Sequence, residues 1–116
     1  MSRNATGMRR AALVLTSSVT PTSKAMVSET VFVAGLDRVT VPTLIVANAD
    51  DDCVVTPPSD AEAIRRALTR APKAEVMMFA GGSPPRSEAC LGLSPHGYLG
   101  IEARVVDGIA AWVKAQ

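Results

Sequence analysis

The chain has 116 residues, a formal net charge of +1, 47% hydrophobic residues and only 3% aromatic residues. This length suits one domain, or a piece of a larger one, with a core built mainly from small aliphatic side chains. No basic cluster is longer than the pairs at 9–10 and 65–66, which argues against a nucleic-acid partner. No apolar run approaches the roughly 20 residues that cross a bilayer, so we expect no membrane association.

The N-terminal third allows two interpretations. Residues 1–10 are basic and residues 11–15 are apolar, an order that loosely resembles a signal peptide. The apolar core is about five residues long, against the usual 7–15, so a strand over 11–15 is the favoured interpretation. Residues 18–40 show no periodicity, and we expect a long irregular connection there.

A continuous apolar run precedes three acidic residues in the middle of the chain. Pro42 lies near the start of the run, where a missing N–H costs least, and the apolar residues continue to Ala47. Such a run predicts a strand buried on both faces, as in a parallel sheet. Asp50, Asp51 and Asp52 follow closely. Open α/β sheets place ligands and catalytic groups beyond the carboxyl ends of their strands, so these carboxylates are site candidates.

Alternating elements complete the chain. Ser59 and Glu62 have the spacing of a capping box, which predicts a helix over 59–68. Residues 73–80 predict a third strand, and residues 81–95 form a glycine- and proline-rich loop. A hydrophobic stripe after the loop predicts a last helix, formed by Ile101, Val105, Ile109 and Trp112 and widened by Val106 and Val113. This order predicts an α/β fold with about three parallel strands and two main flanking helices.

His96 is the only histidine, and it lies in the loop after the third predicted strand. Residues just beyond the carboxyl ends of adjacent parallel strands can approach one another. A carboxylate bonded to one imidazole nitrogen fixes the tautomer and leaves the other nitrogen as a general base. On spacing alone, the alternative is an incidental loop histidine and a solvated acidic turn.

These motifs, taken in order, resemble the C-terminal portion of an α/β-hydrolase. They are Val-Pro-Thr-Leu-Ile-Val at 41–46, Asp51, Val-Thr-Pro-Pro at 55–58, the helix and strand that follow, and Ser-Pro-His-Gly-Tyr at 94–98. The resemblance covers residues 10–116. It implies a single, incomplete α/β-hydrolase domain over 1–116 that acts on a small ester or acyl compound without a cofactor or metal.

The resemblance also implies that Asp51 is the triad acid and His96 the base. Asp51 is preferred to Asp50 and Asp52 because family members usually place the acid three residues after a glycine. Asn48 occupies that glycine position here. Asparagine tolerates positive φ better than most residues, so the turn can still form.

The nucleophile motif of the family, Gly-x-Ser-x-Gly, does not occur in this sequence. Ser83 lacks the last glycine, Ser94 belongs to the histidine loop, and Ser17 and Ser18 lack both flanking glycines and a following helix. We therefore expect the chain to supply the acid and the histidine of a serine-type hydrolase and to be inactive alone. The alternative is a non-catalytic α/β module that pairs with a complementing N-terminal polypeptide or with itself.

Cys53 follows the acidic residues, and Cys90 precedes His96 in the same loop. A disulfide between them would tie the two loops together, and some secreted or periplasmic bacterial hydrolases that the chain resembles carry a comparable pair. Two buried free thiols are the alternative. A disulfide implies a periplasmic or secreted protein, and free thiols imply a cytoplasmic one. With one histidine and no Cys-x-x-Cys spacing, a zinc site is not expected.

Overall fold

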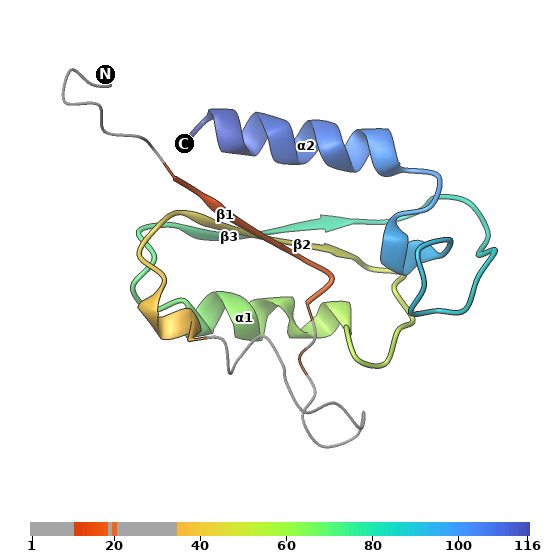
Figure 1. Ribbon diagram of the computed structural model, residues 1–116, viewed down its shortest axis with the longest axis horizontal. Coiled ribbons are helices and arrows are strands. Elements are labelled where there is room, and N and C mark those ends of the chain that lie inside the picture. Colours follow the sequence, from red (N-terminus) through yellow and green to blue (C-terminus); the bar gives the residue numbers. More distant parts are fainter. Residues whose placement is uncertain (1–10, 19, 21–34) are drawn as a thin grey trace.

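The computed structural model describes residues 11–18, 20 and 35–116. Most of the connection expected over 18–40, and the basic segment 1–10, lie outside the described residues. Within them, three strands form a parallel sheet in the order β1 (Leu13–Thr16), β2 (Thr43–Asn48) and β3 (Ala74–Phe79). The helix α1 (Ala61–Ala67) covers one face and α2 (Glu102–Lys114) covers the other (Figure 1). The α/β class, with three parallel strands and two main helices, is confirmed.

The central strand β2 is buried along its whole length. Its alternate side chains point to opposite faces of the sheet. Ile45 joins the cluster under α1, whereas Leu44 and Val46 join the cluster under α2. A strand that faces a helix layer on both sides needs an almost continuous apolar run, as the sequence indicated.

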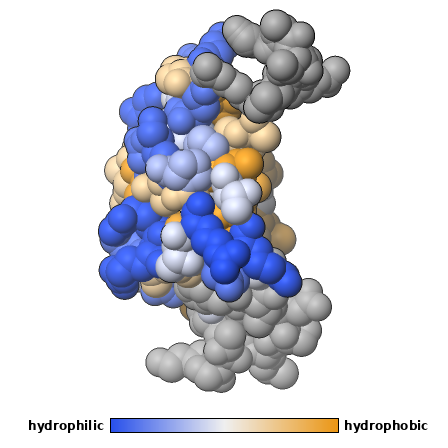
Figure 2. Space-filling view, turned by 90° about the vertical axis from the view of Figure 1, so that its left-hand side faces the viewer, coloured by the Kyte–Doolittle hydropathy of each residue, from blue (hydrophilic) through white to orange (hydrophobic). Residues whose placement is uncertain are grey.

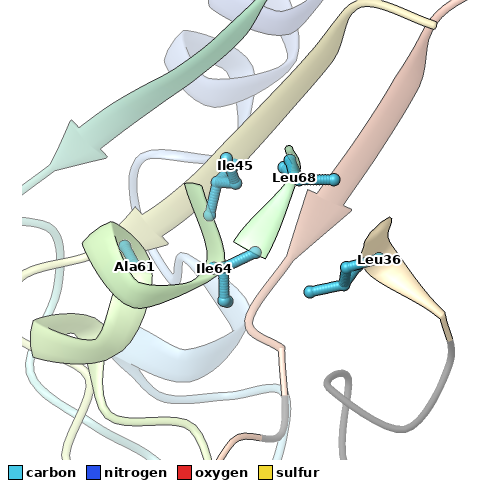
Figure 3. Packing of buried hydrophobic residues seen from close by; sticks show 5 residues of the cluster. All are labelled: Leu36, Ile45, Ala61, Ile64 and Leu68. Carbon is cyan, nitrogen blue, oxygen red and sulfur yellow. The ribbon is translucent and has the colours of Figure 1, made fainter. Parts of the chain in front are cut away.

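The cluster on the α1 side is shown in Figure 3. There α1 directs its apolar side chains toward the strands, and a short 3-10 turn, Leu36–Arg38, adds Leu36 from the side. The buried members are Leu36, Ile45, Ala61, Ile64 and Leu68. Each lies at 5% exposure or less, so α1 is held to the sheet by packing.

The predicted capping box does not form. A 3-10 turn, Pro58–Asp60, precedes α1, and Asp60 is the N-cap residue without a side-chain cap hydrogen bond. Ser59 lies inside this tighter turn, and the carboxylate of Glu62 pairs with Arg65 one turn further along the helix. The Glu62 carboxylate thus pairs along the helix, and no side-chain hydrogen bond caps the helix start.

The opposite face of the sheet packs against α2. The buried residues there are Leu44, Val46, Ile101, Val105 and Trp112, with Ile109 partly buried beside them. The two valines expected to widen the stripe are exposed, Val106 by 62% and Val113 by 42%, so that expectation was wrong. Each directly follows a buried residue, and one residue turns a helix by roughly 100°, which directs both side chains away from the sheet.

The two ends of the sheet differ in character. The strands begin at the end shown in Figure 2, where hydrophilic side chains form most of the described surface. The strands end on the opposite side, where the segment after β2 and the loop after β3 lie close together (Figure 1). The acidic residues and His96 both belong to this carboxyl end.

Candidate functional site

The acid turn begins where β2 ends. The backbone N–H of Asp51 donates to the carbonyl of Asn48 at 3.0 Å, which turns the chain back. The Asp51 side chain is buried, and its Oδ1 accepts the backbone N–H of Cys53 at 2.9 Å. Its Oδ2 accepts the hydroxyl of Thr56, also at 2.9 Å. These bonds hold the carboxylate in one orientation.

The two neighbouring carboxylates, Asp50 and Asp52, have other surroundings. Asp50 is exposed, and its Oδ2 accepts the backbone N–H of Gly81 at 2.9 Å. Asp52 is exposed and lines a small pocket beside the loop after β3. Of the three acidic residues, Asp51 is the one that contacts His96.

His96 lies in a 3-10 turn, Pro95–Gly97, at the carboxyl end of the sheet. Its Nδ1 is 3.1 Å from Oδ2 of Asp51, and their side chains are 22% and 2% exposed, respectively. The structure therefore brings together the two residues singled out in the sequence, although their catalytic role stays a prediction. No partner for the other ring nitrogen, Nε2, is found among the described residues, so this atom is left available for a proton.

Asn48 links the acid turn to the histidine turn. It is 1% exposed; its Oδ1 accepts the backbone N–H of Asp50 at 2.9 Å, and its Nδ2 donates to the carbonyl of Pro95 at 3.2 Å. The expected turn forms, but Asn48 is the last residue of β2 and its φ is not positive, so the turn does not need a left-handed residue at this position. Its side-chain amide, which a glycine lacks, makes both contacts.

We expect Asn48→Ala to lower the free energy of unfolding by about 1–3 kcal/mol, because the Pro95 carbonyl and the Asp50 N–H lose their partner. Urea denaturation followed by far-ultraviolet circular dichroism measures the loss. Asp52→Ala, in the same turn but exposed, serves as the control and should change the free energy by less than about 0.5 kcal/mol. Equal effects of the two substitutions would show that the amide bridge is not a specific tether.

A second tether comes from the end of β1. The hydroxyl of Ser17 donates to the carbonyl of His96 at 3.1 Å and lies 3.5 Å from the hydroxyl of Tyr98. The Tyr98 hydroxyl donates to the carbonyl of Val46 at 3.2 Å. Ser17 and Tyr98 have φ of 45° and 60°, in the left-handed region that side chains other than glycine rarely adopt. Both strained residues hold the histidine turn against the sheet.

Burial raises the pKa of Tyr98 above its ordinary value of 10.0, the Ser17 hydrogen bond lowers it, and the Asp51 charge raises it. The folded protein thus holds the phenol proton more tightly than the unfolded chain. This stabilisation is complete below pH 10.0 and is lost as pH rises through the raised pKa. We expect a higher tyrosinate midpoint in the native protein than in denaturant.

Absorbance near 295 nm reports on Tyr98 alone, because the chain has one tyrosine. Asp51→Asn should lower the native midpoint, since a negative charge is removed, and Ser17→Ala should raise it. A native midpoint equal to that in denaturant would contradict the expectation.

The disulfide expected from the resemblance is present. The sulfurs of Cys53 and Cys90 are 2.04 Å apart, and their Cα atoms are 4.7 Å apart. Cys53 is buried next to the acid turn, while Cys90 is exposed in the loop that leads to His96. The crosslink therefore joins the two segments that carry Asp51 and His96.

Two serines that were considered as nucleophiles have other partners. Ser94 is 0% exposed, and its hydroxyl donates to the carbonyls of Ala89 and Leu91. The Ser17 hydroxyl donates to a backbone carbonyl, as described above. No serine hydroxyl in the part of the chain that the structure describes is hydrogen-bonded to the His96 ring.

Thr56 contacts both members of the pair and was missed in the sequence. Its hydroxyl lies 3.0 Å from Nδ1 of His96, besides its bond to Asp51. The Val-Thr-Pro-Pro motif drew attention to this segment, but a threonine five residues after an aspartate carries no specific signal of its own.

Residues 11–18, 20 and 35–116 show neither a metal-binding cluster nor a membrane-spanning helix. No group of His, Cys, Asp and Glu side chains there is arranged to hold a metal ion. None of the helices there combines the length and hydrophobicity that crossing a bilayer requires.

Comparisons with protein-family models, curated proteins and solved structures found no match for the chain. The described residues define an α/β protein that carries a buried carboxylate and an imidazole, in hydrogen-bond contact, at the carboxyl end of a parallel sheet.

Proposed function

We propose that the chain is the C-terminal part of a serine-type α/β-hydrolase, that the complete enzyme acts on an ester or acyl compound, and that the chain alone is inactive. The observation that supports this proposal is the 3.1 Å contact between Nδ1 of His96 and the buried Oδ2 of Asp51. A carboxylate that is buried, oriented by two other donors and aimed at an imidazole is the arrangement that general-base catalysis needs.

In the proposed reaction, His96 uses its free Nε2 to take the proton of a serine hydroxyl. The serine oxygen bonds to the carbonyl carbon of the substrate, and Asp51 stabilises the imidazolium that forms. The imidazolium then returns the proton to the leaving alkoxide as the ester bond breaks. Water attacks the acyl-serine in the same way and regenerates the hydroxyl. The serine and the oxyanion donors belong, in this proposal, to another segment or chain.

The disulfide supports a location in the periplasm or outside the cell. Disulfides persist in oxidising compartments and are rare where thiols are kept reduced. The Cys53–Cys90 crosslink, with Cys90 exposed, would meet reductants in a cytosol.

The test is labelling with a fluorophosphonate, which reacts only with an activated serine. The tagged chain is purified from its source with any bound polypeptide and labelled. We expect no label on residues 1–116, and a label on a Gly-x-Ser-x-Gly serine of a bound polypeptide or an in-frame extension. His96→Ala should abolish the label, whereas Arg70→Ala, exposed after α1, should leave it unchanged. A label that survives His96→Ala would exclude His96 as the base.

A second candidate function is a non-catalytic module that pairs through its sheet edges. The observation that favours it is that β1 and β3 are the outer strands of the described sheet, and that Met78 on β3 is 45% exposed. Exposed strand edges and apolar side chains favour association.

Sedimentation of the pure chain distinguishes this candidate. We expect concentration-dependent association that Met78→Lys weakens and that Glu75→Gln, also exposed on β3, does not. Association without a labelled serine on any partner would favour the module over the hydrolase. A monomeric state at all concentrations, with sharp unfolding, would argue against self-association.

A further inference from the structure

The hydroxyl of Thr56 contacts both the proposed acid and the proposed base, which also contact each other. Its hydroxyl oxygen is 2.9 Å from Oδ2 of Asp51 and 3.0 Å from Nδ1 of His96, and these two atoms are 3.1 Å from each other. Thr56 is 3% exposed, so water does not compete freely for its hydroxyl. The proton positions in this group therefore follow from counting donors and acceptors.

An ionised Asp51 can only accept hydrogen bonds. A contact of 3.1 Å between its Oδ2 and Nδ1 of His96 is favourable when Nδ1 carries the hydrogen. The hydrogen of the Thr56 hydroxyl then goes to Oδ2, and the Thr56 oxygen faces the Nδ1–H as a second acceptor. In the opposite arrangement the hydroxyl donates to a bare Nδ1. That arrangement is unfavourable, because the lone pair of Nδ1 then faces the negatively charged carboxylate.

The surroundings do not let the group rearrange freely. Oδ1 of Asp51 is occupied by the Cys53 N–H, so the carboxylate cannot rotate without losing a bond. The Thr56 N–H donates to the carbonyl of Cys53 at 3.1 Å, and Cys53 is crosslinked to the histidine loop. The Thr56 hydroxyl is thus held between the two side chains from a fixed backbone.

We propose that Thr56 is a positioning residue that holds His96 in the Nδ1–H tautomer. Its hydroxyl donates a hydrogen bond to Asp51, and its oxygen accepts one from Nδ1–H. Nε2 is then the ring nitrogen that accepts a proton. The use of that Nε2 as a base rests on the proposed function. The tautomer itself does not, and it can be read in the chain without a serine or a substrate.

The test is nuclear magnetic resonance of the 15N-labelled chain at alkaline pH. His96 is the only histidine, so the ring signals need no further assignment. Long-range 1H–15N correlation distinguishes a protonated from an unprotonated ring nitrogen. In the wild type we expect a protonated Nδ1, an unprotonated Nε2 and a slowly exchanging Nδ1 proton.

Thr56→Val removes the hydroxyl at nearly constant volume. We expect a mixture of tautomers and an exchange of the Nδ1 proton faster by on the order of tenfold, which corresponds to the loss of about one hydrogen bond. Thr56→Ser should restore the wild-type signals, because the hydroxyl is retained. Thr43→Val makes the same change at a threonine of 0% exposure, whose hydroxyl bonds to the Val41 carbonyl at the start of β2, and should leave the ring signals unchanged.

A wild-type ring in the Nε2–H tautomer would overturn the proposal, and so would a Thr56→Val variant with wild-type ring signals. If Thr56→Val does not fold, Thr56→Ala, which also lacks the hydroxyl, takes its place in the comparison with Thr56→Ser. Ring signals that change in Thr56→Val, in a chain that never yields a labelled serine, would refute the hydrolase and retain the role of Thr56. A labelled serine together with ring signals that do not change in Thr56→Val would refute the role of Thr56 and retain the hydrolase.

Discussion

The Cys53→Ser/Cys90→Ser variant should unfold with a free energy about 3–4 kcal/mol lower than the wild type. The crosslink spans 37 positions of the sequence, and a loop of that length loses this much chain entropy in the unfolded state when it is closed. Domains of this size have a total stability of about 5–15 kcal/mol, so the loss would be a large fraction of it. Cys53 is 2% exposed, which adds the cost of placing a polar hydroxyl in a buried position.

Urea denaturation with and without a reductant measures this effect. Reduction should move the wild type close to the double variant, and the double variant itself should not respond to reductant. Titration of the denatured, unreduced wild type should find almost no free thiol. Two free thiols per chain, from a host with an oxidising compartment, would show that the crosslink does not form in solution.

Asp51→Asn should lower kcat by about 10⁴-fold once the chain is joined with the segment that carries the serine. The substitution keeps the size of the side chain but replaces an acceptor by an amide that can donate to Nδ1 of His96. That donation favours the tautomer with a hydrogen on Nε2, which can no longer accept the serine proton. The 3.1 Å contact is the reason to expect so large an effect from one atom.

The neighbours of Asp51 provide matched controls for this measurement. Asp50→Asn and Asp52→Asn make the same chemical change one residue away on either side. Asp50 bonds to the N–H of Gly81, and Asp52 is exposed, so both variants should retain kcat within about threefold. A loss at Asp52 equal to that at Asp51 would show that the acid has been misassigned. Hydrolysis of an activated ester in the reconstituted enzyme reports all three values.

The sequence was informative where the physical signal is local. The apolar run at 41–47 predicted a strand buried on both faces, and every residue of β2 is buried. Ile101, Val105 and Trp112 predicted the face of the last helix, and all three are buried there. Such patterns can be read because a strand and a helix repeat every two and every 3.6 residues, whatever the rest of the chain does.

Predictions from the sequence failed where the same residues can form more than one local structure. The capping box at 59–62 was displaced by a 3-10 turn and by the ion pair of Glu62 with Arg65, both compatible with the same residues. Val106 and Val113 are as apolar as their buried neighbours, yet the sheet does not reach their side of α2. Which solution is adopted depends on what packs against the helix.

By itself, the sequence determined the order of the elements, the α/β class and the carboxyl end of the sheet as the place for Asp51 and His96. Only the tertiary structure decided which of three adjacent carboxylates faces the imidazole, that Asn48 bridges the two turns through its amide, and that Thr56 joins the pair. The reason is distance along the chain. Thr56 and His96 are 40 positions apart, and Asn48 and Pro95 are 47 apart. Such contacts depend on how two loops pack, which periodicity does not encode.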